Sequence, residues 1–452
     1  MEKRNVRLSI IGLGKLGSPM VAVFAHKGYE VIGLDINASF VAALTEGRAP
    51  VEEPQLQELI TQNRERIKAT TDYTTAIAES DVTFVIVPTP SGPDLFFTNK
   101  YVLESVARIG DALRKKQGYH VVVITSTVMP GSTGSEIQAA LEAASGRKVG
   151  PDLGLCYNPK FIALGSVVKD MLHPDMILIG ESDDKAGAVL EGIYRNSTNS
   201  NPQFHRMNFV NAELTKISVN TYVTTKISYA NMIADLCDHI PGADSDVVNR
   251  AVGADSRIGK KYLKSAIGYG GPCFPRDNKA FAALGRKLGA RCDLAEATDK
   301  INDHQLARLQ GAVEASAAPN KTVSVLGLSY KPETGVIEAS QGVMLAKLLA
   351  EAGYKVSVFD PLANEHARAV LGTAITVASS AAAAVKTADV VVITTPWDEF
   401  KTLSGDDLRN RTVIDPWRAI SEKAAASAAK HIILGRSDSA ISASKASRTA
   451  AA

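Results

Sequence analysis

Short apolar runs recur along the chain, and the first of them leads directly into a glycine-rich turn. The run 7–11 predicts a buried strand, and a helical pattern follows it to about His26. Further buried strands are predicted over 29–35, 81–90, 119–128, 154–159 and 176–180. Strands that alternate with helices are typical of a parallel sheet covered by helices. The pattern therefore predicts an α/β domain over residues 1–205.

Longer helical patterns replace the strands in the middle of the chain. They cover about 211–237, 280–288 and 294–315. Lys216 and Asn220 lie four residues apart and therefore on one face of the first helix. A solvated face is the usual place for a lysine, whereas the asparagine one turn further on favours a shared polar site. Because long helices with apolar stripes commonly form dimer interfaces, we expect a central helical dimerisation domain over 206–315.

The last part of the chain repeats the opening alternation. Strands are predicted over 321–328, 354–360 and 388–397, with a helix over about 342–352. This part lacks the Gly-x-Gly-x-x-Gly turn that follows the first strand of the chain, so we expect it to bind a different nucleotide from the opening domain. We place this domain at 316–436, followed by a disordered Ser/Ala-rich tail over 437–452. The whole pattern predicts two parallel-sheet α/β domains joined by a domain of long helices.

Composition narrows the class of protein. The chain has 452 residues, 45% hydrophobic and 22% charged, which is typical of a globular protein of two or three domains. A net charge of +2 gives no general attraction for nucleic acid or for an anionic membrane. The 4 cysteines are scattered and include no Cys-x-x-Cys pair, which argues against a disulfide framework and against a metal site. Without a signal peptide or a long apolar run, we expect a soluble cytoplasmic protein with no membrane partner.

The first glycine-rich turn predicts a dinucleotide site. Gly12-Leu-Gly-Lys-Leu-Gly17 lies between a predicted strand and a helix, and the next strand ends in Asp35, about 20 residues further on. Gly12 allows the tight turn, Gly14 lets the backbone approach a pyrophosphate, and Gly17 lets the helix pack closely on the strand. Asp35 would accept hydrogen bonds from ribose hydroxyls and repel a 2′-phosphate, which favours NAD over NADP. A glycine-rich turn without a ligand is the alternative.

Polar residues follow two of the later strands. Thr89 lies after one of them, and Ser126 and Thr127 lie at the end of the next. Ligands of open α/β sheets gather at the carboxyl ends of the strands, so these residues are candidates to line the nicotinamide end of the site. The segment from Pro88 to Pro90 could equally be a stiff loop.

The most unusual stretch is Gly268-Tyr-Gly-Gly-Pro-Cys-Phe-Pro-Arg-Asp-Asn278. Its paired glycines allow a close approach of the backbone, and its prolines stiffen the turn. Cys273 lies near Arg276 and Asp277; a thiol reacts as the thiolate, which a nearby cation favours, and an aspartate can act as a base. A tight loop around a buried structural cysteine is the alternative.

Together these residues resemble the UDP-glucose/GDP-mannose dehydrogenase family over nearly the whole chain. The most specific match is Gly270-Gly-Pro-Cys273-Phe-Pro-Arg-Asp277, which is similar to the family's Gly-Gly-x-Cys-x-x-Lys/Arg-Asp. The resemblance implies a Rossmann-like NAD-binding domain, a homodimer or higher homo-oligomer formed through the long central helix, and a C-terminal domain that binds a UDP-sugar. It implies oxidation of the C6 alcohol of a nucleotide-linked hexose to a uronic acid in two hydride transfers, with NAD as cofactor.

The resemblance also implies roles for single residues. Cys273 would capture the aldehyde as a thiohemiacetal, Asp277 would take the proton with Lys216 and a water, and Lys216 and Asn220 would stabilise the oxyanion. The other catalytic candidates are Thr127 and Lys160. The candidates to bind the cofactor are Gly12, Gly14, Leu16, Gly17, Asp35, Thr89, Pro90, Ser126, Thr127 and Arg276. The candidates to bind the substrate are Phe161, Lys216, Asn220, Arg257, Tyr269, Gly270 and Lys331.

The chain departs from the family pattern where water chemistry is expected. Lys160 stands where members usually carry a glutamate, and Leu164 stands at a second acidic position. A lysine can act as a base only when it is neutral, which requires a strongly lowered pKa. The segment 333–340 lacks the family's arginine. Three interpretations stay open: full oxidation in a divergent subgroup, an enzyme that stalls before thioester hydrolysis, and a silent nucleotide-sugar binder, against which the intact turn and cysteine argue.

Overall fold

The chain folds into two compact units, each built around a parallel sheet. The computed structural model describes residues 6–316 and 320–437. The units comprise Met1–Ser218 and Val219–Ala452, and the boundary falls within the long helix α9 (Phe209–His239). The domain boundaries expected at 205/206 and 315/316 stay predictions. The expected tail, apart from Ser437, lies outside the described residues.

The described part of the first unit contains an eight-stranded sheet. In sheet order its strands are β3 (Ile67–Thr70), β2 (Val31–Leu34), β1 (Leu8–Ile11), β4 (Val82–Val85), β5 (Val121–Ile124), β6 (Gly154–Tyr157), β7 (Met176–Glu181) and β8 (Gln203–Met207). Neighbouring strands from β3 to β6 pair in parallel, β6 and β7 pair antiparallel, and β7 and β8 pair in parallel. The order from β3 to β6 is that of the dinucleotide-binding Rossmann fold, in which ligands lie at the carboxyl edge beside β1 and β4.

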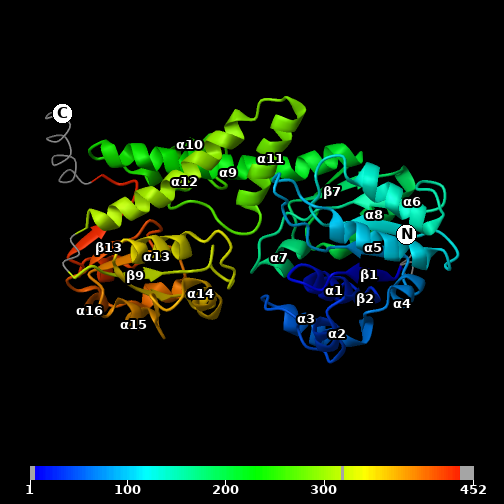
Figure 1. Cartoon of the computed structure of the whole chain (residues 1–452), viewed down its shortest axis with the longest axis horizontal. Coiled ribbons are helices and arrows are strands. Elements are labelled where there is room, and N and C mark those ends of the chain that lie inside the picture. The colour runs from blue at the N-terminus through cyan, green and yellow to red at the C-terminus, as the bar shows by residue number, and fades with distance from the viewer. Residues whose placement is uncertain (1–5, 317–319, 438–452) are drawn as a thin grey trace. The chain divides into compact units, whose positions relative to one another are not determined.

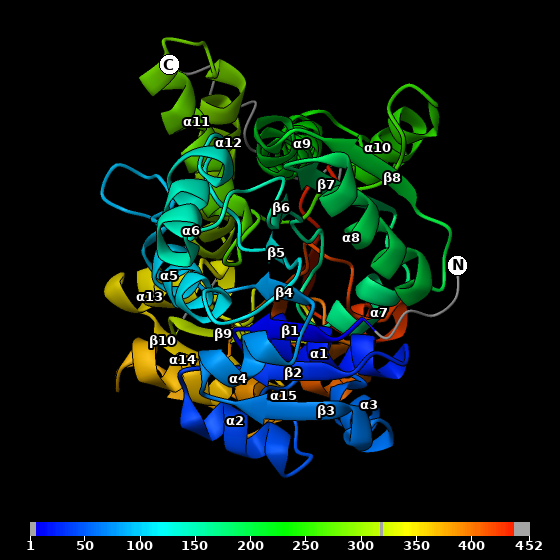
Figure 2. The same cartoon turned by 90° about the vertical axis from the view of Figure 1, so that its right-hand side faces the viewer.

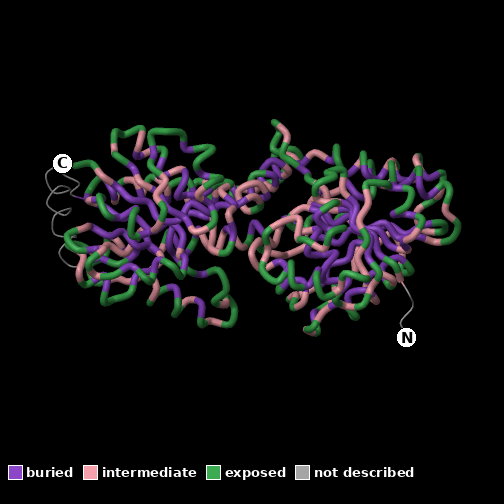
Figure 3. The backbone as a smooth tube through the Cα atoms, turned by 90° about the horizontal axis from the view of Figure 1, so that it is seen from below, coloured by how far each residue is buried: buried purple, intermediate pink, exposed green. Residues whose placement is uncertain are grey.

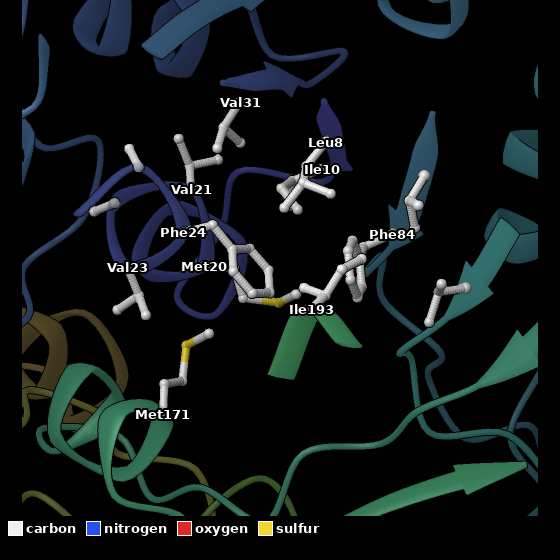
Figure 4. Packing of buried hydrophobic residues seen from close by; sticks show 14 of the residues in the cluster. Leu8, Ile10, Met20, Val21, Val23, Phe24, Val31, Phe84, Met171 and Ile193 are labelled. Atoms are coloured by element: carbon white, nitrogen blue, oxygen red, sulfur yellow. The ribbon is translucent and has the colours of Figure 1, made fainter. Parts of the chain in front are cut away.

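Helices cover both faces of this sheet (Figures 1 and 2). One face packs against α1 (Gly17–His26), α3 (Leu56–Gln62), α7 (Val167–Leu172) and α8 (Asp184–Ser197). The other packs against α4 (Tyr73–Ala78), α5 (Lys100–Leu113), α6 (Gln138–Ser145) and the start of α9. The remaining helix of the unit's opening part is α2 (Ala38–Thr45). Figure 4 shows the first core, in which the rings of Phe24 and Phe84 lie 5.3 Å apart between centroids.

The second unit begins with helices and ends with a sheet. Its helices before the sheet, besides α9, are α10 (Ser245–Ala254), α11 (Phe274–Leu288) and α12 (Asp293–Glu314). The strands, in sheet order and all parallel, are β11 (Thr376–Val377), β10 (Lys355–Phe359), β9 (Thr322–Leu326), β12 (Val390–Ile393), β13 (Thr412–Ile414) and β14 (Lys430–Ile432). The helices within this sheet region are α13 (Gln341–Glu351), α14 (Asn364–Leu371), α15 (Ala381–Val385), α16 (Gly405–Leu408) and α17 (Glu422–Ala425).

The two-sheet α/β architecture predicted from the sequence is confirmed. Figure 3 shows buried residues in the interior of each unit. All residues of β1, β2, β4, β5, β6 and β12 are buried, as the apolar runs predicted. The described elements include several that the sequence analysis did not place, among them β3, β8 and α10. The helix that follows the cysteine loop begins at Phe274, earlier than the expected start near Ala280. Its first turn contains Pro275, which a helix tolerates because the first N–H groups have no partner within the helix.

Candidate active site

The turn after β1 has the geometry of a phosphate cradle. Gly12 has φ +98°, and a Cβ atom there would lie 2.3 Å from the carbonyl oxygen of Ile86. A Cβ atom at Gly17 would lie 1.6 Å from the carbonyl oxygen of Gly12, so only glycine lets α1 approach the turn this closely. A Cβ atom at Gly14 would meet nothing within 4 Å, which leaves its backbone open to a ligand. The turn therefore fits a pyrophosphate at the N-terminus of α1.

Asp35 completes this cradle at the end of β2. Its carboxylate accepts hydrogen bonds from the backbone N–H of Leu13 at 2.6 Å and of Asn37 at 2.8 Å. The carboxylate is thus tied to the glycine-rich turn and remains partly exposed. Leu16 precedes α1 and packs against the core of the unit. The described residues fit NAD: the turn would hold its phosphates, and Asp35 would accept hydrogen bonds from its ribose hydroxyls.

Hydrogen bonds of the predicted polar residues join the loop after β4 to the loop after β5. The Ser126 hydroxyl donates to the carbonyl oxygen of Val87 at 2.7 Å and accepts from its N–H at 2.9 Å. The Thr89 hydroxyl donates to the carbonyl oxygen of Thr127 at 2.7 Å. Pro90 accepts a backbone hydrogen bond from Thr98 at 2.9 Å. The bonds of Ser126 and Thr89 hold the two loops together at the carboxyl edge of the sheet, and the bond to Pro90 closes the first loop on itself.

Glu213 anchors the start of α9 to the turn that follows β5. Its buried carboxylate accepts hydrogen bonds from the N–H groups of Gly131 at 2.6 Å and of Thr133 at 2.7 Å. Burial raises the pKa of Glu213, and the two hydrogen bonds oppose that shift. These two hydrogen bonds fix the start of α9 against the sheet, and they thereby also fix Lys216, which lies about one turn further along the helix.

Lys216, on α9, is buried, with 6% of its surface exposed. Its ammonium nitrogen donates to the carbonyl oxygen of Lys160 at 2.8 Å and lies 4.9 Å from the centroid of the Phe161 ring. The structure therefore brings together three of the predicted site residues, and it joins them through a backbone oxygen and a ring face. Lys216 is not on a solvated face.

The side chain of Lys160 points into a polar cluster of the first unit. Its Nζ donates to Asn158 Oδ1 at 2.7 Å, donates to the Tyr194 hydroxyl, and lies 4.2 Å from the centroid of the Tyr194 ring. The Tyr194 hydroxyl also donates to Asn158 Oδ1 at 2.6 Å. Burial lowers the pKa of Lys160 to about 7 and raises the pKa of Tyr194. Leu164 packs against the apolar core.

In the second unit, Cys273 lies immediately before α11 and is exposed. A buried structural cysteine is therefore excluded. Asp277, in the first turn of α11, is 1% exposed and accepts a hydrogen bond from Asn220 Nδ2 at 2.6 Å. Arg276 lies beside it, with 3.4 Å between Nε and Asp277 Oδ1. An anion at Cys273 would be stabilised by the N-terminus of the helix.

The glycines before Cys273 are held by close backbone contacts. A Cβ atom at Gly270 would lie 2.3 Å from the carbonyl oxygen of Ala339, and one at Gly271 would lie 2.6 Å from the Tyr330 ring. The N–H of Gly271 donates to the carbonyl oxygen of Glu338 at 2.9 Å. The segment that departs from the family pattern therefore lies against the cysteine loop.

Three further residues predicted to bind the substrate, Tyr269, Arg257 and Lys331, differ in their exposure and contacts. The backbone of Tyr269 donates to Asn302 Oδ1 at 2.7 Å and accepts from Asn302 Nδ2 at 3.1 Å, and its hydroxyl donates to Asp299 at 3.1 Å. Arg257 has an 86% exposed side chain that pairs with Asp255 at 2.6 Å. Lys331, which follows the Tyr330 ring in the chain, is partly buried.

The sequence pattern does not single out three residues that shape these sites: Tyr194, Asn302 and Glu53, whose carboxylate accepts hydrogen bonds from the N–H groups of Gly165 and Val167. Each acts through contacts with residues that are distant in the chain. Tyr194 occupies an ordinary apolar position of an amphipathic helix, and Asn302 is one polar residue among many on α12. No local pattern in the sequence distinguishes them.

A dinucleotide cradle on one sheet and an exposed cysteine beside a buried aspartate define a dinucleotide-dependent oxidoreductase. Three family models match the chain in order: the NAD binding domain over residues 6–198, the central domain over 210–304 and the UDP binding domain over 324–422. The chain belongs to the UDP-glucose/GDP-mannose dehydrogenase family, and its first unit contains that family's NAD-binding domain.

Individual relatives cover almost the whole chain. It is 37% identical to the UDP-glucose 6-dehydrogenase AglM of Haloferax volcanii, covering 92% of this chain and 98% of that one. It is 33% identical to the UDP-glucose 6-dehydrogenase TuaD of Bacillus subtilis, over 88% and 85% of the two chains. Among solved structures, a UDP-glucose dehydrogenase from Pyrobaculum islandicum superimposes with a TM-score of 0.89 at 33% identity, over 96% and 99%. Within residues 6–316 and 320–437, no helix combines the length and apolarity needed to cross a membrane.

Proposed function

We propose that this protein oxidises the C6 alcohol of a UDP-linked hexose to a carboxylate, with Cys273 as a covalent nucleophile. The observation that carries this proposal is the exposed thiol before α11, one helical turn from a buried Asp277 that is bound by Asn220. A dehydrogenase that stops at a ketone has no use for a thiol in this position. The UDP binding domain matched over 324–422 supports a UDP-sugar as substrate.

The first oxidation removes a hydride from C6 and a proton from its hydroxyl. Bound NAD supplies the hydride acceptor for this step and for the second one. The proton passes to Asp277, with Lys216 and a water, and the carbonyl of the resulting aldehyde is polarised by Lys216 and Asn220. The short bond from Asn220 orients the carboxylate of Asp277.

The second oxidation takes place on the cysteine. The Cys273 thiolate adds to the aldehyde carbon, the new alkoxide takes up a proton, and a thiohemiacetal forms. Loss of a hydride from C6 and of the hydroxyl proton gives a thioester. Water then adds to the thioester, the C–S bond breaks, and Cys273 returns as a thiol. Overall, an alcohol and a water become a carboxylate, with release of two hydrides and three protons.

The test is the yield of NADH with UDP-glucose and with UDP-N-acetylhexosamines. We expect sustained turnover at two NADH per sugar with one of these substrates, and no second hydride transfer in Cys273→Ala. Full production of two NADH per sugar by Cys273→Ala would refute the covalent mechanism. Failure of the wild-type protein to reduce NAD with any nucleotide sugar would refute the function and favour a silent binder.

A second candidate is an enzyme that stalls at the thioester. It is favoured by the absence of any carboxylate between Asn158 and Lys169 in the sequence, and by the packing of Leu164 against the apolar core. This candidate predicts a burst of NADH that ends after a single turnover. Mass spectrometry of the protein would then find the acyl group on Cys273, whereas unmodified Cys273 with free uronate in solution would reject this candidate.

The homodimer and the cytoplasmic location stay predictions.

A further inference from the structure

The segment 158–167 is fixed to the first unit at its beginning. The N–H of Asn158 donates to the carbonyl oxygen of Ile124 on β5 at 2.8 Å, and its amide Nδ2 donates to that of Leu178 on β7 at 2.8 Å. The side-chain oxygen of Asn158 accepts from both Lys160 and Tyr194. The start of the segment is therefore tied to two strands and to α8.

Glu53 fixes the end of the same segment. It lies between α2 and α3, and its carboxylate accepts hydrogen bonds from the N–H of Gly165 at 2.8 Å and from the N–H of Val167 at 2.7 Å. Val167 is the first residue of the short helix α7 and Gly165 lies just before that helix, so the carboxylate also interacts favourably with its N-terminus. The segment is thus held at both ends by side chains remote in the sequence.

Between these anchors the segment offers two groups to Lys216. They are the carbonyl oxygen of Lys160, at 2.8 Å, and the ring of Phe161, at 4.9 Å. The side chain of Lys160 meanwhile points the other way, onto the Tyr194 ring. One residue therefore presents its backbone to Lys216 and uses its side chain to hold that backbone in place. Among the described residues, Lys160 forms no ion pair with a carboxylate.

We propose that Lys160 is a positioning residue, whose side-chain nitrogen pins segment 158–167 on Tyr194 and Asn158 so that the segment holds Lys216 for hydride transfer. The kinetic part of this proposal rests on the proposed function. It differs from the interpretation of Lys160 as the base of thioester hydrolysis, because the Nζ already donates to Asn158 Oδ1 and the Tyr194 hydroxyl inside the unit. The two roles affect different steps of the reaction.

The kinetic test compares Lys160→Met with the wild type in rapid-mixing experiments. Methionine keeps the length of the side chain and removes its charge and donors. We expect the rate of the first NADH burst to fall at least tenfold, with Cys273 unmodified in the variant. Tyr194→Phe, which keeps the ring and removes the hydroxyl, should lower the same burst rate about two- to fivefold. An unchanged burst rate would overturn the proposal. If an acyl group also accumulated on Cys273, the result would instead favour a role of Lys160 in thioester hydrolysis.

A second readout needs no substrate. Trace acetylation with acetic anhydride, followed by mass spectrometry, reports the reactivity of the Lys216 amine at each pH. We expect Lys160→Met to raise acetylation of Lys216 at least fivefold and to shift its pH profile, because the carbonyl oxygen of residue 160 is no longer held against it. The matched control is Lys169→Met, which changes an exposed lysine on α7 and should leave both readouts unchanged. Unaltered labelling of Lys216 in Lys160→Met would overturn the proposal even if the proposed function failed.

Discussion

Replacing Lys160 by methionine should change how the stability of the first unit depends on pH. Burial against Tyr194 and Asn158 lowers the pKa of Lys160 from its ordinary value of 10.5 to about 7. In the unfolded chain the amine regains the ordinary pKa, so in the window between these values the unfolded state binds more protons than the folded state. The contribution of Lys160 to stability therefore rises with pH across this window and is lost as the pH falls towards 7.

The magnitude follows from the two pKa values. One unit of pKa difference is worth about 1.4 kcal/mol. With pKa values of 10.5 and about 7, raising the pH from about 7 to about 9.5 should add about 3 kcal/mol to the free energy of unfolding of the wild-type unit. Lys116, whose pKa burial lowers to about 8, is present in both proteins, so its contribution cancels in the comparison.

The assay is hydrogen exchange in increasing urea, followed by mass spectrometry of peptides that cover residues 154–172. Peptide resolution is needed because a chain of two compact units need not unfold in one transition. The quantity to plot is the difference in unfolding free energy between wild type and Lys160→Met against pH. A difference that does not change with pH would show that the amine keeps its ordinary pKa, and would refute its enclosure by Tyr194 and Asn158.

Three further outcomes are expected. Gly14→Ala should leave thermal stability unchanged but weaken NAD binding in a calorimetric titration, because the new Cβ atom meets only the space left for the ligand. Gly17→Ala should lower both thermal stability and NAD affinity, with a stability loss of about 1–3 kcal/mol or more. Equal behaviour of the two variants would contradict the phosphate-binding role of the turn. Asn220→Ala should slow the first hydride transfer at least tenfold, since a bond to a buried carboxylate is worth about 1.5–3 kcal/mol; an unchanged burst would remove Asn220 from the orientation of Asp277. Asn302→Ala should speed hydrogen exchange in the loop before Cys273, and unchanged exchange would show that the loop is held by other contacts.

Much of the fold could be predicted because the apolar runs and the glycines act locally. A buried parallel strand needs a continuous apolar run, and the turn at Gly12 needs a residue that tolerates φ +98°. Short edge strands such as β3 and β8, which are only partly buried, carry no such signal and were missed. The early start of α11 was missed because prolines were interpreted as loop residues, although the first turn of a helix accepts them.

The sequence by itself indicated the class of chemistry: a glycine turn with Asp35 for a dinucleotide, and Cys273 with Asp277 for the covalent oxidation that we propose. These motifs can be recognised in the sequence because their residues are contiguous or are separated by a characteristic number of residues. Only the tertiary structure decided what the side chain and the backbone of Lys160 contact. In the sequence it stands as a cation where the family has an acid, and three interpretations are open. In the folded unit its charge is enclosed by Tyr194, 34 residues away, and its carbonyl oxygen meets Lys216, 56 residues away. The direction of a side chain is set by packing between remote elements, and no local pattern encodes it.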